Sequence, residues 1–384
     1  MKDRRFSSLL LVRWCYTNKS VVGGPTTFPQ LTALLCFVII FTVGLSRLVS
    51  LAEQGLGFLP KTREKQQHNV EDVNIPSRDT ILTAKGVVTY MEIEQKVFLP
   101  YNYKIIESSF PIPKLDFVSK PSCRKIFEDW LNITSRPAPA EPPKEIKESD
   151  KDDFLLNGYS VLYEYEYSND KASPILLIWD DIDEMMKKPR SAVKRYVDGP
   201  AVYYALRDYP LTNLTGFVIG SRQPWVEVQA LRSGASEVYT VEYEDVKVAE
   251  ATRIRYIHPI KFAEQWEVNA DRFDFAISFS SIEHSGLGRY GDPIDPIGDM
   301  REVQKIMCLL KKGGFFFVGV PRGIDAIKYN LHRVYGRIRL AMIMAGFEWV
   351  AMYRGNSPYP QWPRREDFEE VNEHKQDLYV LRKL

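Results

Sequence analysis

The sequence of 384 residues has little cysteine, almost no net charge and no internal repeat. Its 51 basic and 50 acidic residues give a formal charge of +1, so it offers no concentrated basic surface for phosphates and we expect no nucleic-acid partner. The four cysteines lack the spacing of a metal site, and no bound metal is expected. Cys123 and Cys308 fall in the main body, where they either pair or remain free thiols.

One long apolar run stands near the N-terminus. Residues 31–49, LTALLCFVIIFTVGLSRLV, carry a single charge, Arg47, and about 20 apolar residues suffice for a membrane-spanning helix. Basic residues dominate the stretch before it, which favours a cytoplasmic N-terminus. The sequons at Asn132 and Asn213 agree with a lumenal, glycosylated body. We predict a single-pass type II membrane protein of the secretory pathway, in the Golgi; a signal peptide cleaved near Ala52 is the alternative.

Composition divides the chain into segments. The first three are a cytoplasmic tail at 1–30, a transmembrane signal anchor at 31–50 and a polar stem at 51–77. A small accessory region is expected at 78–136, followed by a flexible linker or loop at 137–153, which is rich in proline and charge, and by the main domain at 154–384.

Strand and helix patterns alternate in the main domain. The expected strands are the apolar runs at 216–220, 237–243, 254–257, 273–279 and 315–321, and the expected helices lie at 224–234 and 299–310. This alternation predicts an α/β fold with a mostly parallel sheet covered on both faces. GFEWVAMYR and DLYVLRKL are typical of two closing strands, which predicts an antiparallel final strand.

Polar residues follow several of these strands, where open α/β sheets bind their ligands. Gly220 ends the first strand, Glu242 ends the second, and the segment from Ser281 to His284 follows the fourth. Glu242 lies 22 positions beyond Gly220, an interval at which an acid accepts hydrogen bonds from the hydroxyls of a ribose. A solvated carboxylate at a strand end is the alternative.

These residues, with LLKKGG before the fifth strand, resemble the class I S-adenosylmethionine-dependent methyltransferases over roughly residues 211–384. More narrowly, IEHSGLGRYGDPIDPIGD and YNLHRVYG are similar to the family called domain of unknown function 268. The resemblance implies a Rossmann-like methyltransferase sheet and the cofactor S-adenosylmethionine. The cofactor-binding residues it implies are Gly220, Ser221, Glu242, Ser281 and Ile282. The sequence departs from the family after Gly220, where Ser221 and Arg222 replace the usual glycine cluster and Arg222 adds a charge near a cationic sulfonium.

Candidate residues for methyl transfer follow from the same loops. A hydroxyl acceptor needs a base, and His284 is the first candidate because the pKa of histidine lies near neutrality. The other candidates are Asp292 as a second base, Glu283 as an orienting carboxylate, His332 as a further catalytic residue, and Asp295 and Arg333 as acceptor-binding residues. A lumenal location predicts a glycan hydroxyl as the acceptor, and a reversed topology would favour small metabolites or lipids.

Two other functions are compatible with the sequence. In a metal-dependent glycosyltransferase, Asp181 and Asp183 would hold a divalent ion against a nucleotide sugar. In a non-catalytic binding protein, the same fold would have lost its cofactor together with the glycine cluster.

Overall fold

The structure is a computed structural model that describes residues 79–108, 111–135, 141–168, 176–248, 253–370 and 375–384. The described residues belong to one compact unit, residues 74–384. The predicted tail, anchor and stem lie outside the described residues. Within the described ranges, no helix has the length and apolar character needed to cross a bilayer.

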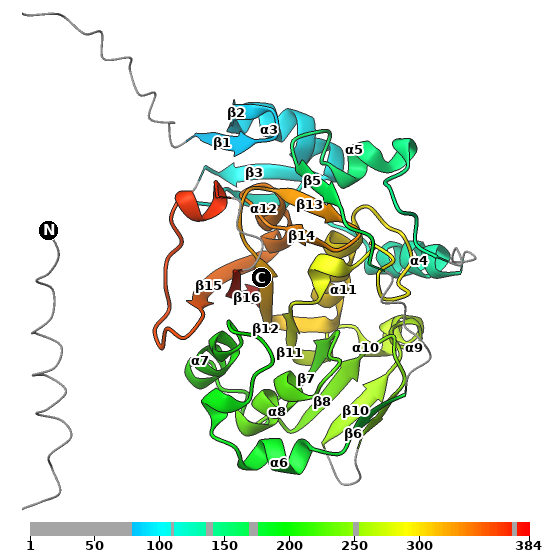
Figure 1. The fold of residues 1–384 in the computed structure, drawn as a ribbon, viewed down its shortest axis with the longest axis vertical. Coiled ribbons are helices and arrows are strands. Elements are labelled where there is room, and N and C mark those ends of the chain that lie inside the picture. The colour runs from blue at the N-terminus through cyan, green and yellow to red at the C-terminus, as the bar shows by residue number, and fades with distance from the viewer. Residues whose placement is uncertain (1–78, 109–110, 136–140, 169–175, 249–252, 371–374) are drawn as a thin grey trace, which may run out of the picture. The chain divides into compact units, whose positions relative to one another are not determined.

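A seven-stranded sheet forms the centre of this unit (Figure 1). Its strands are β7 (Thr215–Ile219), β8 (Glu237–Val241), β10 (Ile254–Ile257), β11 (Phe273–Phe279), β12 (Leu310–Pro321), β15 (Phe347–Arg354) and β16 (Gln376–Lys383). They lie in the order β10-β8-β7-β11-β12-β16-β15, and β16 runs antiparallel to both neighbours while the other pairs are parallel. This order, third-second-first-fourth-fifth-seventh-sixth along the chain, is that of the class I methyltransferase sheet and confirms the predicted fold.

Alternating apolar side chains fix which helices cover each face of the sheet. Phe217 packs into one core cluster and the next residue, Val218, into the other, as expected for a strand buried on both faces. The cluster of Val218 includes residues of α6 (Ile182–Lys187), α7 (Pro200–Asp208) and α8 (Trp225–Arg232). The cluster of Phe217 includes residues of α9 (Pro259–Glu264), α11 (Gly298–Leu309) and α12 (Arg339–Met344), with α10 (Trp266–Asn269) packed against it.

Smaller elements surround this core. The remaining helices are α3 (Tyr90–Ile93), α4 (Cys123–Thr134) and α5 (Lys151–Phe154), with short turns η1 (Glu94–Phe98), η2 (Leu99–Tyr101), η3 (Glu148–Asp150), η4 (Arg190–Ala192), η5 (Ile282–His284) and η6 (Glu366–Phe368). The remaining strands pair as β1 (Thr80–Thr83) with β2 (Gly86–Thr89), β3 (Tyr103–Glu107) with β4 (Lys114–Phe117), and β6 (Leu177–Trp179) with β9 (Val246–Val248). A three-stranded sheet has the order β14 (His332–Val334), β13 (Ala326–Tyr329), β5 (Val161–Tyr165).

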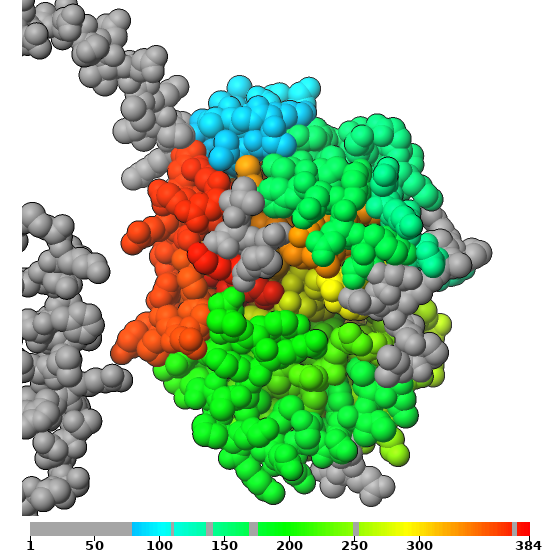
Figure 2. Space-filling view, in the orientation of Figure 1, coloured from blue at the N-terminus to red at the C-terminus, as the bar shows by residue number. Residues whose placement is uncertain are grey.

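The N-terminal part of the described chain packs directly against the methyltransferase-like part. The blue segment in Figure 2 borders the red one, and Arg365 and Arg337 both donate hydrogen bonds to the carbonyl of Thr80. The region expected to be a flexible linker also differs from that expectation where it is described. Its last residues form η3 and the start of α5, and its Ile146 is buried in one cluster with Phe154 of α5 and with Ile327 and Tyr329 of β13.

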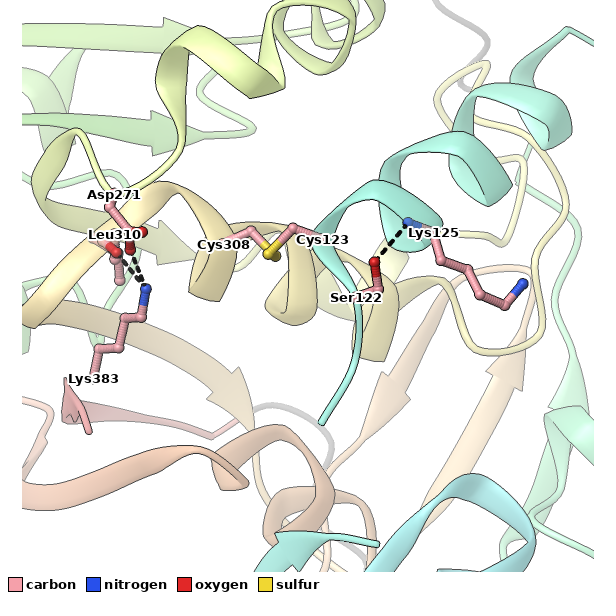
Figure 3. The surroundings of a disulfide bond; sticks show 7 residues. All are labelled: Ser122, Cys123, Lys125, Asp271, Cys308, Leu310 and Lys383. Atoms are coloured by element: carbon pink, nitrogen blue, oxygen red, sulfur yellow. Dashed lines mark hydrogen bonds and ion pairs between the residues drawn. A yellow bond between two sulfur atoms is a disulfide. The ribbon is translucent and has the colours of Figure 1, made fainter. Parts of the chain in front are cut away.

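A disulfide joins Cys123 to Cys308, which answers the question that the sequence left open (Figure 3). Cys123 begins α4, whose N-terminus is capped by the Ser122 hydroxyl, and Cys308 lies in the last turn of α11. The two cysteines are separated by 185 positions, so the bond ties the accessory region to a helix of the main sheet.

Two segments that the sequence analysis assigned to no element belong to strands. The KKGG segment is not a turn, because β12 starts at Leu310 and runs through it with a register shift against β11. The shift accommodates the extra residues, so that Phe273 pairs with Leu310 and Phe275 with Phe315. YNLHRVYG belongs to the hairpin of β13 and β14, and His332 and Arg333 lie in β14.

Candidate active site

A cavity opens at the carboxyl ends of β7, β8 and β11, where the strand order reverses between β7 and β11. Open α/β sheets bind their ligands at this kind of reversal. The cavity is partly open to solvent. Of the predicted site residues it is lined by Gly220, Glu242, Ser281, His284, Asp292 and Asp295.

Gly220 forms the turn that leads from β7 into the cavity. Its φ of +75° is the left-handed conformation that favours glycine, and its N–H donates to the carbonyl of Val241 over 3.0 Å. A Cβ atom added here would lie 1.9 Å from the Ser281 hydroxyl oxygen. The glycine therefore lets the ends of β7 and β11 approach each other closely beneath the cavity.

Glu242 follows β8 and is almost fully buried in the cavity wall. Burial raises the pKa of its carboxyl to about 7, although one carboxylate oxygen accepts a hydrogen bond of 2.7 Å from the N–H of Tyr243. The side chain thus holds a carboxyl group at the strand end where the sequence places a partner for ribose hydroxyls.

Arg222 replaces part of the missing glycine cluster, and its charge is balanced locally. Its guanidinium donates two hydrogen bonds of 3.0 Å to the carboxylate of Glu244, which is buried. Because Glu244 neutralises the guanidinium in this bidentate pair, Arg222 does not repel a cationic ligand, as its sequence position suggests it would. Ser221 is buried and is not among the lining residues.

The segment after β11 divides its side chains between the cavity and the core. Ser281 and His284 line the cavity, whereas Ile282 is part of the core and Glu283 is fully enclosed. Burial raises the pKa of Glu283 to about 7, and its carboxylate oxygen Oε1 lies 3.9 Å from His284 Nε2. Ile282 therefore packs in the core and does not line the cavity.

His284 is held in one tautomer by the backbone. Its Nδ1 lies 2.6 Å from the carbonyl oxygen of Leu331, which can only accept a hydrogen bond, so the proton is on Nδ1 and Nε2 keeps its lone pair. Burial, reinforced by the charge of Arg289, lowers the pKa of the ring to about 3. His284 is therefore neutral near pH 7 and is a weak base in the free protein.

Asp292 and Asp295 shape the loop that follows η5. One carboxylate oxygen of Asp292 accepts hydrogen bonds from the N–H groups of Gly286 and Gly288, at 2.7 and 3.1 Å. Asp295 accepts from the Arg301 guanidinium over 2.7 Å. Both acids reach the cavity, but these bonds also fold the loop, as expected for short acidic side chains in turns.

The predicted acceptor residues of β14 are placed elsewhere. His332 and Arg333 are not among the lining residues, and Arg333 is fully buried. Its guanidinium donates to the carbonyls of Ser285 and Pro296 over 2.6 and 3.0 Å and lies 3.6 Å from the carboxylate of Asp299. In this structure the hairpin turns the Arg333 side chain, predicted from sequence to bind an acceptor, into the core behind the loop.

The cavity includes residues that the sequence did not single out. Phe127 and Trp130 of α4, Tyr243 after β8, and Glu302 and Lys305 of α11 all line it. The sequence hints at Glu302 and Lys305 only weakly, because an acid and a base three positions apart in an amphipathic helix predict a side-chain pair but not a ligand site. The sequence gives no hint of Phe127 and Trp130, because only the contact of α4 with α11 and α9 brings them to the site.

The acids of the glycosyltransferase hypothesis lie outside this cavity. Asp181 precedes α6 and Asp183 is exposed in its first turn, and neither lines the cavity. Among the described residues, no group of three or more His, Cys, Asp or Glu side chains is arranged to hold a metal ion.

Comparisons with known proteins agree with the fold. Residues 213–384, somewhat under half of the chain, match the family described as "Caenorhabditis protein of unknown function, DUF268", which confirms the resemblance stated above. No curated protein sequence matches the chain.

Three solved structures illustrate the likeness. The first is a Burkholderia thailandensis 1,6-didemethyltoxoflavin-N1-methyltransferase with bound S-adenosylhomocysteine, which is 18% identical with a TM-score of 0.34, over 50% of this chain and 79% of that chain. The second is an S-adenosylmethionine-dependent methyltransferase from Mesorhizobium loti, which is 20% identical with a TM-score of 0.30, over 49% of this chain and 100% of that chain. The third is the N-methyltransferase NodS from Bradyrhizobium japonicum, which is 9% identical with a TM-score of 0.31, over 53% of this chain and 98% of that chain. At these low scores the fold is assigned from the sheet order of this chain.

Proposed function

We propose that this protein is an S-adenosylmethionine-dependent methyltransferase. The observation that carries the proposal is the cavity at the reversal between β7 and β11, with the Glu242 carboxyl group in its wall. When bound, S-adenosylmethionine would supply a methyl group on a cationic sulfur. Glu242 would accept hydrogen bonds from its ribose hydroxyls, and Gly220 would let the backbone approach it.

The charges of the cavity fit a cationic ligand. The described lining contains five carboxyl groups and three permanent or basic cations: Glu242, Glu244, Asp292, Asp295 and Glu302 against Arg195, Arg222 and Lys305. Arg222 and Lys305 are each paired with an acid. Asp295 is paired with Arg301 as well, which leaves Glu242 and Asp292 against Arg195. This surplus of one acid favours a positive sulfonium and ammonium group over the diphosphate of a nucleotide sugar.

We propose a glycan hydroxyl in the secretory pathway as the acceptor. The disulfide Cys123–Cys308 supports an oxidising compartment, since such bonds persist there and are rare in the cytosol. In the reaction, the acceptor oxygen forms a bond to the methyl carbon while the bond from that carbon to sulfur breaks. His284 Nε2 would take the hydroxyl proton, and the low pKa of the free ring requires that the bound acceptor raise it.

Calorimetric titration of the full chain with S-adenosylhomocysteine tests the cofactor assignment. We expect saturable binding that Glu242→Ala weakens about 10- to 100-fold, because the ribose hydroxyls lose a charged partner. Glu264→Ala, at the exposed end of α9, is the matched control. A folded protein that ignores S-adenosylhomocysteine but binds a nucleotide sugar would contradict the proposal.

A panel of glycans incubated with S-adenosylmethionine and analysed by mass spectrometry tests the acceptor. Methylated glycan whose formation is lost in His284→Ala would support a hydroxyl acceptor and His284 as its base. Cofactor binding with no methylation of glycans or of small metabolites would favour the non-catalytic alternative.

A further inference from the structure

Part of the cavity lining is an apolar and aromatic cluster from β7, α4, α9, α11 and their neighbours, which forms its inner end. Its walls are Phe127, Trp130, Phe217, Phe262, Ile306 and Leu309. Phe127 and Trp130 come from the accessory region, outside the residues that match the family, and the disulfide fixes their helix to α11. The inner end therefore offers flat apolar surfaces that suit a planar ring.

One charged pair lies within this apolar end. Lys305 Nζ is 2.6 Å from Glu302 Oε1 and 3.5 Å from the centre of the Trp130 ring. Both side chains line the cavity and are largely buried, with 8% and 15% of their surface exposed. Removing two charges from water costs free energy, so a buried pair of this kind calls for an explanation. The Lys305 ammonium and the Glu302 carboxylate place a hydrogen-bond donor beside an acceptor in fixed positions.

The pair and the proposed ribose position share one cavity, whose lining includes Glu242, Tyr243, Glu302 and Lys305. Burial raises the pKa of Tyr243, next to Glu242 at the end of β8, and the charges of both Glu302 and Glu242 raise it further. Both carboxylates therefore act on the Tyr243 hydroxyl. A nucleoside whose ribose met Glu242 would direct its base toward the inner end, since Pro259 and Phe262 of α9 bound the cavity beyond β8.

We propose, on the basis of the function proposed above, that Glu302 and Lys305 read the edge of the cofactor's base and select a 6-aminopurine. The exocyclic amine donates to the Glu302 carboxylate, a ring nitrogen accepts from the Lys305 ammonium, and the ring lies between the aromatic walls of the inner end. A 6-oxopurine reverses donor and acceptor at these two positions. Its 6-oxygen, an acceptor, would face the Glu302 carboxylate, and its ring N–H, a donor, would face the Lys305 ammonium.

The test compares S-adenosylhomocysteine with S-inosylhomocysteine, which differs at position 6 of the base and in the proton on the adjacent ring nitrogen. Calorimetry with the full chain should show that the adenosyl compound binds roughly 10- to 100-fold more tightly, as for a buried site left with mismatched polar groups. In Glu302→Gln and in Lys305→Met this preference should fall to a few-fold. Glu264→Gln, the same chemical change at an exposed position of α9, should keep it.

Equal binding of the two compounds by the unaltered chain would overturn the inference without recourse to any variant. So would a full preference retained in folded Glu302→Gln, which would make the pair a structural link between α11 and α4. Both results would leave the proposed function intact as long as Glu242→Ala weakens binding. Absence of binding by either compound would overturn the function and the inference together.

Discussion

Arg333 is fully buried, and its guanidinium donates to backbone carbonyls on both sides of the loop that frames the cavity. Without these donors, the carbonyls of Ser285 and Pro296 would be buried and unpaired, and Asp299 would lose one of its two nearby guanidinium groups. We expect Arg333→Met to lower the free energy of unfolding by about 3 kcal/mol, measured by urea denaturation. The affinity for S-adenosylhomocysteine should change little in the fraction that remains folded.

Arg382→Met is the matched control for this substitution. Arg382 pairs with Glu348 at the surface, with about half of each side chain exposed, and such pairs contribute less than about 1 kcal/mol. The sequence expectation for Arg333 gives the opposite pattern, an unchanged stability with a raised KM for the acceptor. That pattern would show that the side chain leaves the core and binds substrate.

At the scale of elements, the strands that reach the site can be predicted from their own local sequence. β7, β8 and β11 are short apolar runs ending in polar residues, and buried parallel strands require both features, so Gly220 and Glu242 were found from sequence. The position of α4 depends on contacts with residues far along the chain. Likewise, nothing local to YNLHRVYG indicates that Arg333 turns inward, because its partners are carbonyls of the loop after η5.

The disulfide makes the position of α4 testable. Replacing both Cys123 and Cys308 with alanine opens a link across 185 positions, and loop entropy predicts a loss of up to about 5 kcal/mol. We expect a lower melting temperature and, because Phe127 and Trp130 line the cavity, a several-fold weaker binding of S-adenosylhomocysteine. The reductant dithiothreitol should reproduce both effects in the unaltered chain.

Ser122→Ala is the control that distinguishes loss of the disulfide from a general loss of stability in α4. It removes only the hydroxyl that caps α4, a change that costs about 1 kcal/mol, and it leaves the disulfide in place. Its effect on ligand affinity should therefore be small. If the double alanine variant melts and binds like the unaltered chain, α4 is held by packing alone.

At the scale of the whole molecule, three enclosed carboxyl groups surround the ends of the first strands. Burial raises the pKa of Glu227, Glu242 and Glu283 to about 7 each, from an ordinary value near 4.5. Between these pH values the folded chain holds protons that the unfolded chain has released, so stability falls as pH rises toward 7. Burial lowers the pKa of His284 to about 3 and also lowers that of His258, so both histidines oppose this trend below about pH 6.5, but they are two groups against three.

We therefore expect the melting temperature to fall between pH 5.5 and pH 7.5, measured by differential scanning calorimetry. Glu227→Gln should reduce this fall by at least a third, since it removes one of three carboxyl groups whose effect the histidines partly offset, at a position that does not line the cavity. Ligand affinity should respond in the opposite direction, because ionised Glu242 accepts hydrogen bonds from ribose hydroxyls more strongly than its protonated form does. S-adenosylhomocysteine should therefore raise the melting temperature more at pH 7.5 than at pH 5.5. A melting temperature that rises across this range would show that these carboxyl groups are ionised in the folded chain, and the pH dependence of binding would then disappear with it.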